Sequence, residues 1–186
     1  MNPTLEVIKS RRTTRKFEET QVSDDVLNKI IEAGLFAPSA HNNQPWHFAV
    51  VQNSEILSEL NTGAKNVAMN FDDEGIKKMM SNEKFNIFYN APTVIIVSGR
   101  DSAMMPEVDC AAATQNMLLA AESMDIGACW NGLVSFALKG PNAEGFKETL
   151  SIPEGYSSYY AVALGHKAAR ATNAPARVEN TFTFIR

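Results

Sequence analysis

The segment from Thr93 to Val97 constrains the fold of this chain more than any other feature. All five of its residues are β-branched, and the four after Thr93 are apolar. β-Branched side chains favour strands, and an unbroken apolar run is typical of a strand that is covered on both faces. The sequence therefore predicts a central strand here, and with it a layered fold in which other elements cover the sheet.

A second segment, from Pro106 to Met124, predicts a long helix. Proline suits the first turn of a helix, and the alanine, leucine and methionine residues between Ala111 and Ala121 leave little polar face. We expect a helix of this composition to be buried on nearly all sides, either in the core or in a subunit interface.

Other helices and strands alternate along the rest of the chain. Helices are predicted at residues 4–8, with Thr4 as cap, 23–36, with Ser23 as cap, 54–60 and 145–150, and strands at 45–51, 126–130 and 159–165. Residues 62–90 show no clear pattern and are expected to form helices with mobile connections. The order indicates an α+β or α/β layered fold in one domain, residues 1–186, with a polar arm over about 167–186 that can wrap onto another subunit.

Charge and cysteine content exclude several classes of function. The formal net charge of -4 argues against a nucleic-acid-binding surface, which needs a basic face to neutralise phosphates. Cys110 and Cys129 lack the spacing of a zinc site or a disulfide framework, so both are predicted to be buried thiols in a reducing compartment. The sequence shows neither a signal-peptide pattern nor an apolar run of the roughly 20 residues that span a membrane. We therefore expect a cytoplasmic protein.

The sequence motifs of common catalytic classes are missing. The chain has no dinucleotide-binding glycine pattern, no P-loop and no nucleophile elbow. Its three histidines, His41, His47 and His166, are isolated from one another and from carboxylate clusters. A chain without a strong catalytic constellation can take its chemistry from a bound cofactor.

The most basic stretch contains Arg11, Arg12, Thr13 and Arg15. Guanidinium groups bind phosphate with two parallel hydrogen bonds, and a hydroxyl can supplement them. In an acidic protein, this cluster indicates a site for one bound phosphate. The alternative is a solvated basic helix end that complements the helix dipole.

Two further segments have the composition of ligand-binding loops. Residues 37–46 place amides and hydroxyls between two prolines, next to an aromatic residue, and such a loop can hydrogen-bond a flat heteroaromatic ligand. Residues 127–133 include Gly132, which permits close approach of a ligand to the backbone. The alternatives are an ordinary helix-to-strand connection for the first segment and a tight turn for the second.

Together these segments resemble the nitroreductase-like family of FMN-dependent oxidoreductases. The resemblance lies in Ser10–Phe17, in the loop Ala37–Trp46, and in the helix Gln115–Ala121 that leads into Gly127–Trp130. These features occur in the family's order, and residues 62–90 resemble it least. The resemblance implies a central, mostly antiparallel sheet flanked by helices, and a homodimer that binds FMN at its subunit interface.

The resemblance also implies roles for the cations of the opening stretch. Arg11, Arg12 and Thr13 are expected at the FMN phosphate or ribityl chain. Arg15 is expected to reach the ribityl chain and the C2 oxygen of the ring, where a cation stabilises the negative charge of the reduced flavin. Arg177 of the C-terminal arm is the best match for a further phosphate-binding cation, and Lys167 is the next.

Other residues are expected around the flavin ring. From the second subunit, the resemblance places Pro38, Ser39, Ala40 and, as a weaker candidate that can support the loop instead, Asn42. The family often has serine where Ala40 stands. A backbone N–H of Gly132 or Leu133 is expected to meet flavin N5, and Leu133 replaces a frequent second glycine. A mid-chain asparagine, Asn66 or Asn70, is expected at the pyrimidine edge.

These roles imply an enzyme that takes electrons from NADH or NADPH in a ping-pong cycle and reduces small flat acceptors such as nitroaromatics or quinones. No catalytic side chain and no metal is expected, because the flavin carries the chemistry. Three alternatives remain open: a flavin-binding sensor or carrier, a flavoenzyme of the same fold with different chemistry, such as dehalogenation or oxidation, and a structural protein with a coincidental basic cluster.

Overall fold

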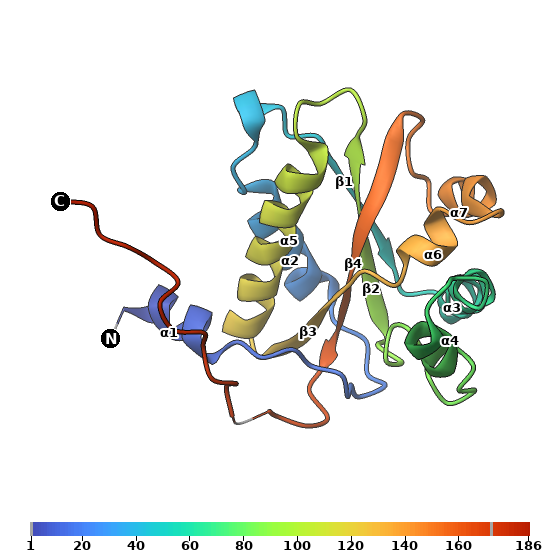
Figure 1. Cartoon of the computed structure of the whole chain (residues 1–186), viewed down its shortest axis with the longest axis horizontal. Coiled ribbons are helices and arrows are strands. Elements are labelled where there is room, and N and C mark those ends of the chain that lie inside the picture. Colours follow the sequence, from blue (N-terminus) through green and yellow to red (C-terminus); the bar gives the residue numbers. More distant parts are fainter. Residues whose placement is uncertain (1, 172) are drawn as a thin grey trace.

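A four-stranded antiparallel sheet with the order β1-β2-β4-β3 organises the computed structural model, which describes residues 2–171 and 173–186 (Figure 1). The strands are β1 (Trp46–Val51), β2 (Thr93–Arg100), β3 (Ile126–Asn131) and β4 (Tyr156–His166). β2 lies between β1 and β4 and is buried along its length except at Arg100. The predicted central strand and the predicted antiparallel sheet are therefore confirmed.

Helices cover both faces of this sheet, and each face has its own hydrophobic core (Figure 1). One face packs against α2 (Asp24–Leu35) and α5 (Pro106–Ser123). The other packs against α3 (Ser54–Ala68), α4 (Glu74–Met80), α6 (Ser135–Leu138) and α7 (Ala143–Thr149). The α+β layered fold predicted from the order of elements is confirmed. Among the described residues, none of the helices combines the length and apolar character needed to cross a membrane.

Two helices show how local sequence sets their bounds. α2 begins after Ser23, as predicted, and buries Leu27, Ile30 and Gly34 against the core. α3 extends to Ala68, well beyond the predicted end at residue 60. Asn53 caps its first turn, and a stripe of small apolar residues continues the buried face past residue 60, so that packing extends the helix.

The first helix and the short helices differ from the predictions in detail. α1 (Pro3–Ser10) is capped by the side chain of Asn2, which accepts hydrogen bonds from Thr4 and Leu5; the predicted cap Thr4 is a donor inside the helix. Within 62–90, the structure forms the end of α3 and α4. The four-residue α6 was not predicted, because one turn is too short to show a periodic pattern.

α5 is buried against the sheet and α2 on one side, and α1 contacts it near its C-terminal end. Cys110, Met117 and Ala121 are completely buried in this layer, whereas Val108 is 56% exposed and Gln115 is also exposed. Within one chain, the outer face of this apolar helix is therefore partly uncovered. Of the two environments predicted for the helix, a core accounts for one side, and the other side is available to a subunit interface.

Ion pairs join the end of β4 to the end of α5. Lys167 Nζ lies 3.0 Å from Glu122 Oε2 and 3.2 Å from Asp125 Oδ1, and Arg170 also pairs with Asp125. The hydrogen bond from Lys167 is the main cause that lowers the pKa of Asp125; burial opposes it, and Arg170 adds to it. This cluster fixes where the predicted C-terminal arm leaves the sheet; position 172 of the arm lies outside the described residues.

Replacement of Asp125 by asparagine should reduce the acid sensitivity of the fold. A carboxylate with a lowered pKa in the folded state stabilises the protein above its unfolded pKa of about 3.9, and the contribution is lost as the pH falls through that value to the folded pKa. The thermal unfolding midpoint of D125N should therefore fall less steeply than that of the wild type between about pH 5 and pH 3. D72N, which changes an exposed carboxylate in the α3–α4 connection, is the control. Parallel curves for D125N and the wild type would contradict the assignment.

Candidate functional site

Residues 11–18 form an extended segment that crosses the ends of β3 and β4. Thr14 N–H donates to the carbonyl of Ala128 at 3.0 Å, and Glu18 N–H donates to the carbonyl of His166 at 3.0 Å. The segment thus adds backbone hydrogen bonds at the margin of the sheet, and these bonds fix the direction in which its basic side chains project.

Two facing glycines admit this segment to the sheet. Gly127 of β3 pairs with Gly165 of β4. A Cβ on Gly127 would lie 2.7 Å from Thr14 Cγ2, and a Cβ on Gly165 would lie 3.0 Å from Phe17 Cδ1. Both distances are too short for nonbonded carbon atoms, so a side chain at Gly127 would press on Thr14, and one at Gly165 would press on Phe17 and on Pro92.

Arg11 and Arg15 gather near the thiol of Cys129 on β3. Burial is the largest influence on this thiol and raises its pKa, whereas the positive charges of Arg15 and Arg11 lower it. The guanidinium of Arg15 lies over the ring of Tyr89, 5.6 Å from its centroid. A hydrogen bond to the Tyr89 side chain is the main cause that raises the pKa of Arg15. Two positive charges therefore act on one buried thiol of the sheet, and Tyr89 contacts one of them.

Arg12 has a partly different environment. Its Nη1 donates to the carbonyls of Lys9 at 2.9 Å and of Arg11 at 2.6 Å, at the end of α1. The alternative reading of a basic helix end thus applies to this part of the guanidinium. Its Nε atom is buried and has no hydrogen-bond partner within the described residues. A buried N–H without an acceptor is costly, and a ligand oxygen would satisfy it.

The predicted loop around residues 38–45 is held in an unusual backbone conformation. Ala40 N–H donates to Asp109 Oδ1 at 3.0 Å, and Gln44 N–H donates to Ser39 Oγ at 3.0 Å. Asn42 Oδ1 accepts a bond from Gln44 Nε2 at 2.9 Å, so Asn42 supports the loop. Asn42 and Gln44 both have positive φ angles, which non-glycine residues adopt rarely.

The loop and the basic cluster lie at opposite ends of α5 (Figure 1). Asp109, which binds the loop, is in the first turn of α5, and Glu122, whose partner Lys167 adjoins the basic segment, is in the last. The helix has 18 residues, so at 1.5 Å per residue its ends are about 27 Å apart. One chain therefore does not bring Pro38, Ser39 and Ala40 together with the cations.

The end of β3 presents one of the two predicted backbone donors. Asn131 Oδ1 accepts hydrogen bonds from Leu133 N–H at 2.8 Å and from Val134 N–H at 3.3 Å. The Leu133 N–H is therefore already occupied. The space beside Gly132 is open, because a Cβ added there would have no other atom within 4 Å. Of the two residues, Gly132 is the one that a ligand can approach.

The remaining predicted residues stay apart from the cluster. Lys167 is held by Glu122 and Asp125. Arg177 lies on the exposed arm, where its guanidinium contacts the carbonyl of nearby Pro175. Asn66, on α3, and Asn70, just past its end, are exposed and line a cavity of about 380 Å³ against the segment 137–146. The structure thus associates none of these four with Arg15.

Three residues of the site were not predicted from the sequence. Asp109, 4% exposed, anchors the loop, and its Oδ2 has no partner among the residues described. A single carboxylate in an otherwise apolar helix face was a signal that could have identified it. Asn131 directly precedes Gly132, a pattern typical of side-chain-capped turns. Tyr89 carried no sequence signal.

Comparison with known proteins gives consistent relatives over nearly the whole chain. The model of the nitroreductase family matches residues 8–166. A protein of Methanothermobacter thermautotrophicus, named as an NADH dehydrogenase/NAD(P)H nitroreductase, is 34% identical over 169 residues, which cover 88% of this chain and 77% of the relative. The resemblance seen in the sequence is therefore confirmed.

Two solved structures share the complete fold. A nitroreductase with bound FMN from Bacteroides fragilis is 35% identical and superposes with a TM-score of 0.93, covering 100% of both chains. A nitroreductase with bound FMN from Desulfitobacterium hafniense is 32% identical, with a TM-score of 0.91 and the same coverage.

Replacement of Asp109 by alanine should release the loop. Loss of a buried acceptor for the Ala40 N–H is expected to destabilise the protein by about 1–3 kcal/mol. D109N keeps an oxygen in the same place and is the matched comparison. Hydrogen exchange measured by mass spectrometry should show faster exchange over residues 38–45 in D109A than in D109N. Equal protection of the loop in D109A and the wild type would show that Asp109 is not its anchor.

Proposed function

The chain belongs to the nitroreductase family, and from this premise we propose that it is an FMN-dependent NAD(P)H oxidoreductase that reduces small flat acceptors. Relatives named NAD(P)H nitroreductase and NADPH-flavin oxidoreductase support an enzyme of this class. The observation that carries the proposal is the buried, unpartnered Nε of Arg12, flanked in sequence by Arg11 and Arg15, whose charges both act on the Cys129 thiol in a chain of net charge -4.

The residues of the cluster fit FMN. Arg11 and Thr13 offer a guanidinium and a hydroxyl for a phosphate or ribityl oxygen. The buried Nε of Arg12 lacks an acceptor within the described chain, as a donor awaiting an anionic ligand would. The open space at Gly132 suits the approach of a flat ring to the backbone. We assign Arg11, Arg12 and Thr13 to the phosphate and ribityl chain, and Arg15 and Gly132 to the ring.

When bound at these residues, FMN would supply hydride and electron transfer between NADH or NADPH and an acceptor such as a nitroaromatic or a quinone, in a ping-pong cycle. The protein needs no nucleophile for this reaction. The guanidinium of Arg15 supplies a fixed positive charge that stabilises negative charge on the reduced ring. The N–H of Gly132 supplies a hydrogen-bond donor at the ring, and the rigid loop orients the reactants against it.

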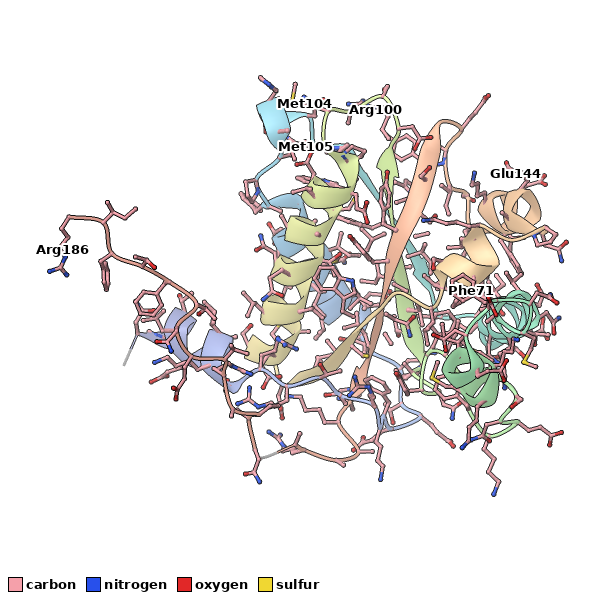
Figure 2. All side chains as sticks on the ribbon, viewed as in Figure 1. Phe71, Arg100, Met104, Met105, Glu144 and Arg186 are labelled. Carbon is pink, nitrogen blue, oxygen red and sulfur yellow. The ribbon has the colours of Figure 1, made fainter. Side chains whose placement is uncertain are left out.

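We propose that the functional unit is a homodimer in which each site takes its cations from one chain and its loop from the other. The separation of the two parts by the length of α5 supports this arrangement. Exposed apolar side chains also gather near the loop: Phe36 is 80% exposed, Met104 66% and Met105 46%, and Figure 2 labels both methionines beside the start of α5. Apolar patches of this kind mark protein interfaces. The exposed C-terminal arm is available to wrap onto the second chain.

The visible absorption spectrum of the purified protein tests the activity. With added FMN, the protein should retain a yellow flavin through gel filtration, and NADH or NADPH added under nitrogen should bleach it. A second addition of a quinone should restore the colour. Bound flavin that neither nucleotide bleaches would favour a sensor or carrier, and failure to bind FMN would overturn the proposal.

Mixed dimers test the shared site. A chain carrying R11A and R15A should bind FMN at least about tenfold more weakly, because charge-assisted hydrogen bonds contribute about 1.5–3 kcal/mol each. A second chain, with residues 39–42 all changed to glycine, should also bind poorly. The mixed dimer, isolated through two different affinity tags, contains one intact site and should bind one FMN with nearly wild-type affinity.

The control for the mixed dimer is K29A, which removes an exposed cation from α2 and should leave FMN affinity unchanged. Equally weak binding by the mixed dimer and by both parent variants would show that cations and loop do not come from different chains.

A further inference from the structure

Tyr89 lies in an irregular connection between α4 and β2 and has a strained backbone. Its φ angle is 57°, and that of the following Asn90 is 56°. Left-handed angles at two consecutive non-glycine residues cost free energy and persist only where the surrounding structure imposes them.

Hydrogen bonds from α3 hold this connection in place. Lys65 Nζ donates to the carbonyls of Asn82 at 2.8 Å and Phe85 at 2.9 Å. Asn61 Oδ1 accepts from Ile87 N–H at 2.9 Å. The turn that carries Tyr89 is therefore attached to a long helix at three points and is positioned before any ligand binds.

The Tyr89 ring contacts two side chains, those of Phe85 and Arg15. The ring of Phe85 meets it edge to face, with 6.0 Å between centroids. The guanidinium of Arg15 lies over it at 5.6 Å, a distance at which cation–π attraction is effective. The hydrogen bond that raises the pKa of Arg15 involves the same tyrosine. Arg15 is otherwise an exposed, long side chain with many rotamers, so Tyr89 restricts where its charge lies.

We propose that Tyr89 is a positioning residue that fixes the Arg15 guanidinium beside Cys129 and thereby sets the reduction potential of the bound flavin. The inference rests on the proposed function, because it assigns Arg15 to the flavin ring. A cation held in one place favours the reduced, more negative flavin over the oxidised one. Tyr89 therefore raises the affinity for reduced FMN relative to oxidised FMN.

The two-electron midpoint potential of the FMN-loaded protein, measured by equilibration with redox dyes, tests this inference. In Y89L, the ratio of affinities for reduced and oxidised FMN should fall about fivefold, which corresponds to a potential about 20 mV lower. In Y89F, which keeps the ring, this ratio of affinities should fall about twofold. In R15A, the ratio should fall at least as far as in Y89L. The double variant Y89L/R15A should have the same ratio as R15A alone. Y156F, which removes the hydroxyl of a tyrosine whose ring meets that of His47 on β1, should keep the wild-type potential.

Each outcome has a defined meaning. A wild-type potential in Y89L together with a lowered one in R15A would overturn the inference and leave the proposed function intact. Additive effects of Y89L and R15A would also overturn it, since Tyr89 would then act independently of Arg15. If Y89L does not fold, Y89F decides: a lowered potential supports the inference and an unchanged one overturns it. Failure of the wild type to bind FMN would instead remove the proposed function itself.

Discussion

The close approach of residues 13–17 to Gly127 and Gly165 is the contact on which the arrangement of the site depends. The two glycines face each other across β3 and β4, and the side chains of Thr14 and Phe17 occupy the space that two Cβ atoms would fill. A larger residue at Gly127 would press on Thr14, whose N–H bonds to the carbonyl of Ala128, and would thereby strain that bond. Arg15, the next residue, would then lose its place near Cys129. The side chains that pack against the sheet and the cation that we assign to the ligand thus lie within the same five residues, 13–17.

Much of the fold could be predicted from periodicity alone. The run from Thr93 to Val97 identified the central strand, because burial on both faces leaves an unambiguous pattern. α3 was predicted too short, since its last turns include Gly63, Lys65 and Asn66, whose weak pattern conceals the buried Ala64 and Ala68. Tertiary packing decides such cases, and a local pattern does not contain it. The same limit applies to the connection that carries Tyr89.

The candidate site was predictable where a residue acts through its own chemistry and not where it acts through a contact distant in sequence. Clustered guanidiniums identified Arg11 and Arg15. The identity of their neighbour Tyr89 depends on how α3 holds the connection before β2, which no local pattern encodes. Resemblance to a family suggested Asn66 or Asn70, yet both lie exposed beside another cavity. A role for either residue at the pyrimidine edge of the flavin stays a prediction.

The cations of this chain are divided into two kinds by what surrounds them. Lys167 and Arg170 meet carboxylates at the end of α5 and fix the chain where β4 ends. The charges of Arg11 and Arg15 both act on the Cys129 thiol, and neither has a carboxylate partner in the described residues. An anion bound only by the folded chain would neutralise these charges and stabilise the fold by mass action. This incomplete pairing is the physical reason that we propose an anionic cofactor at this end of the sheet and not in the cavity of about 380 Å³ beside α3.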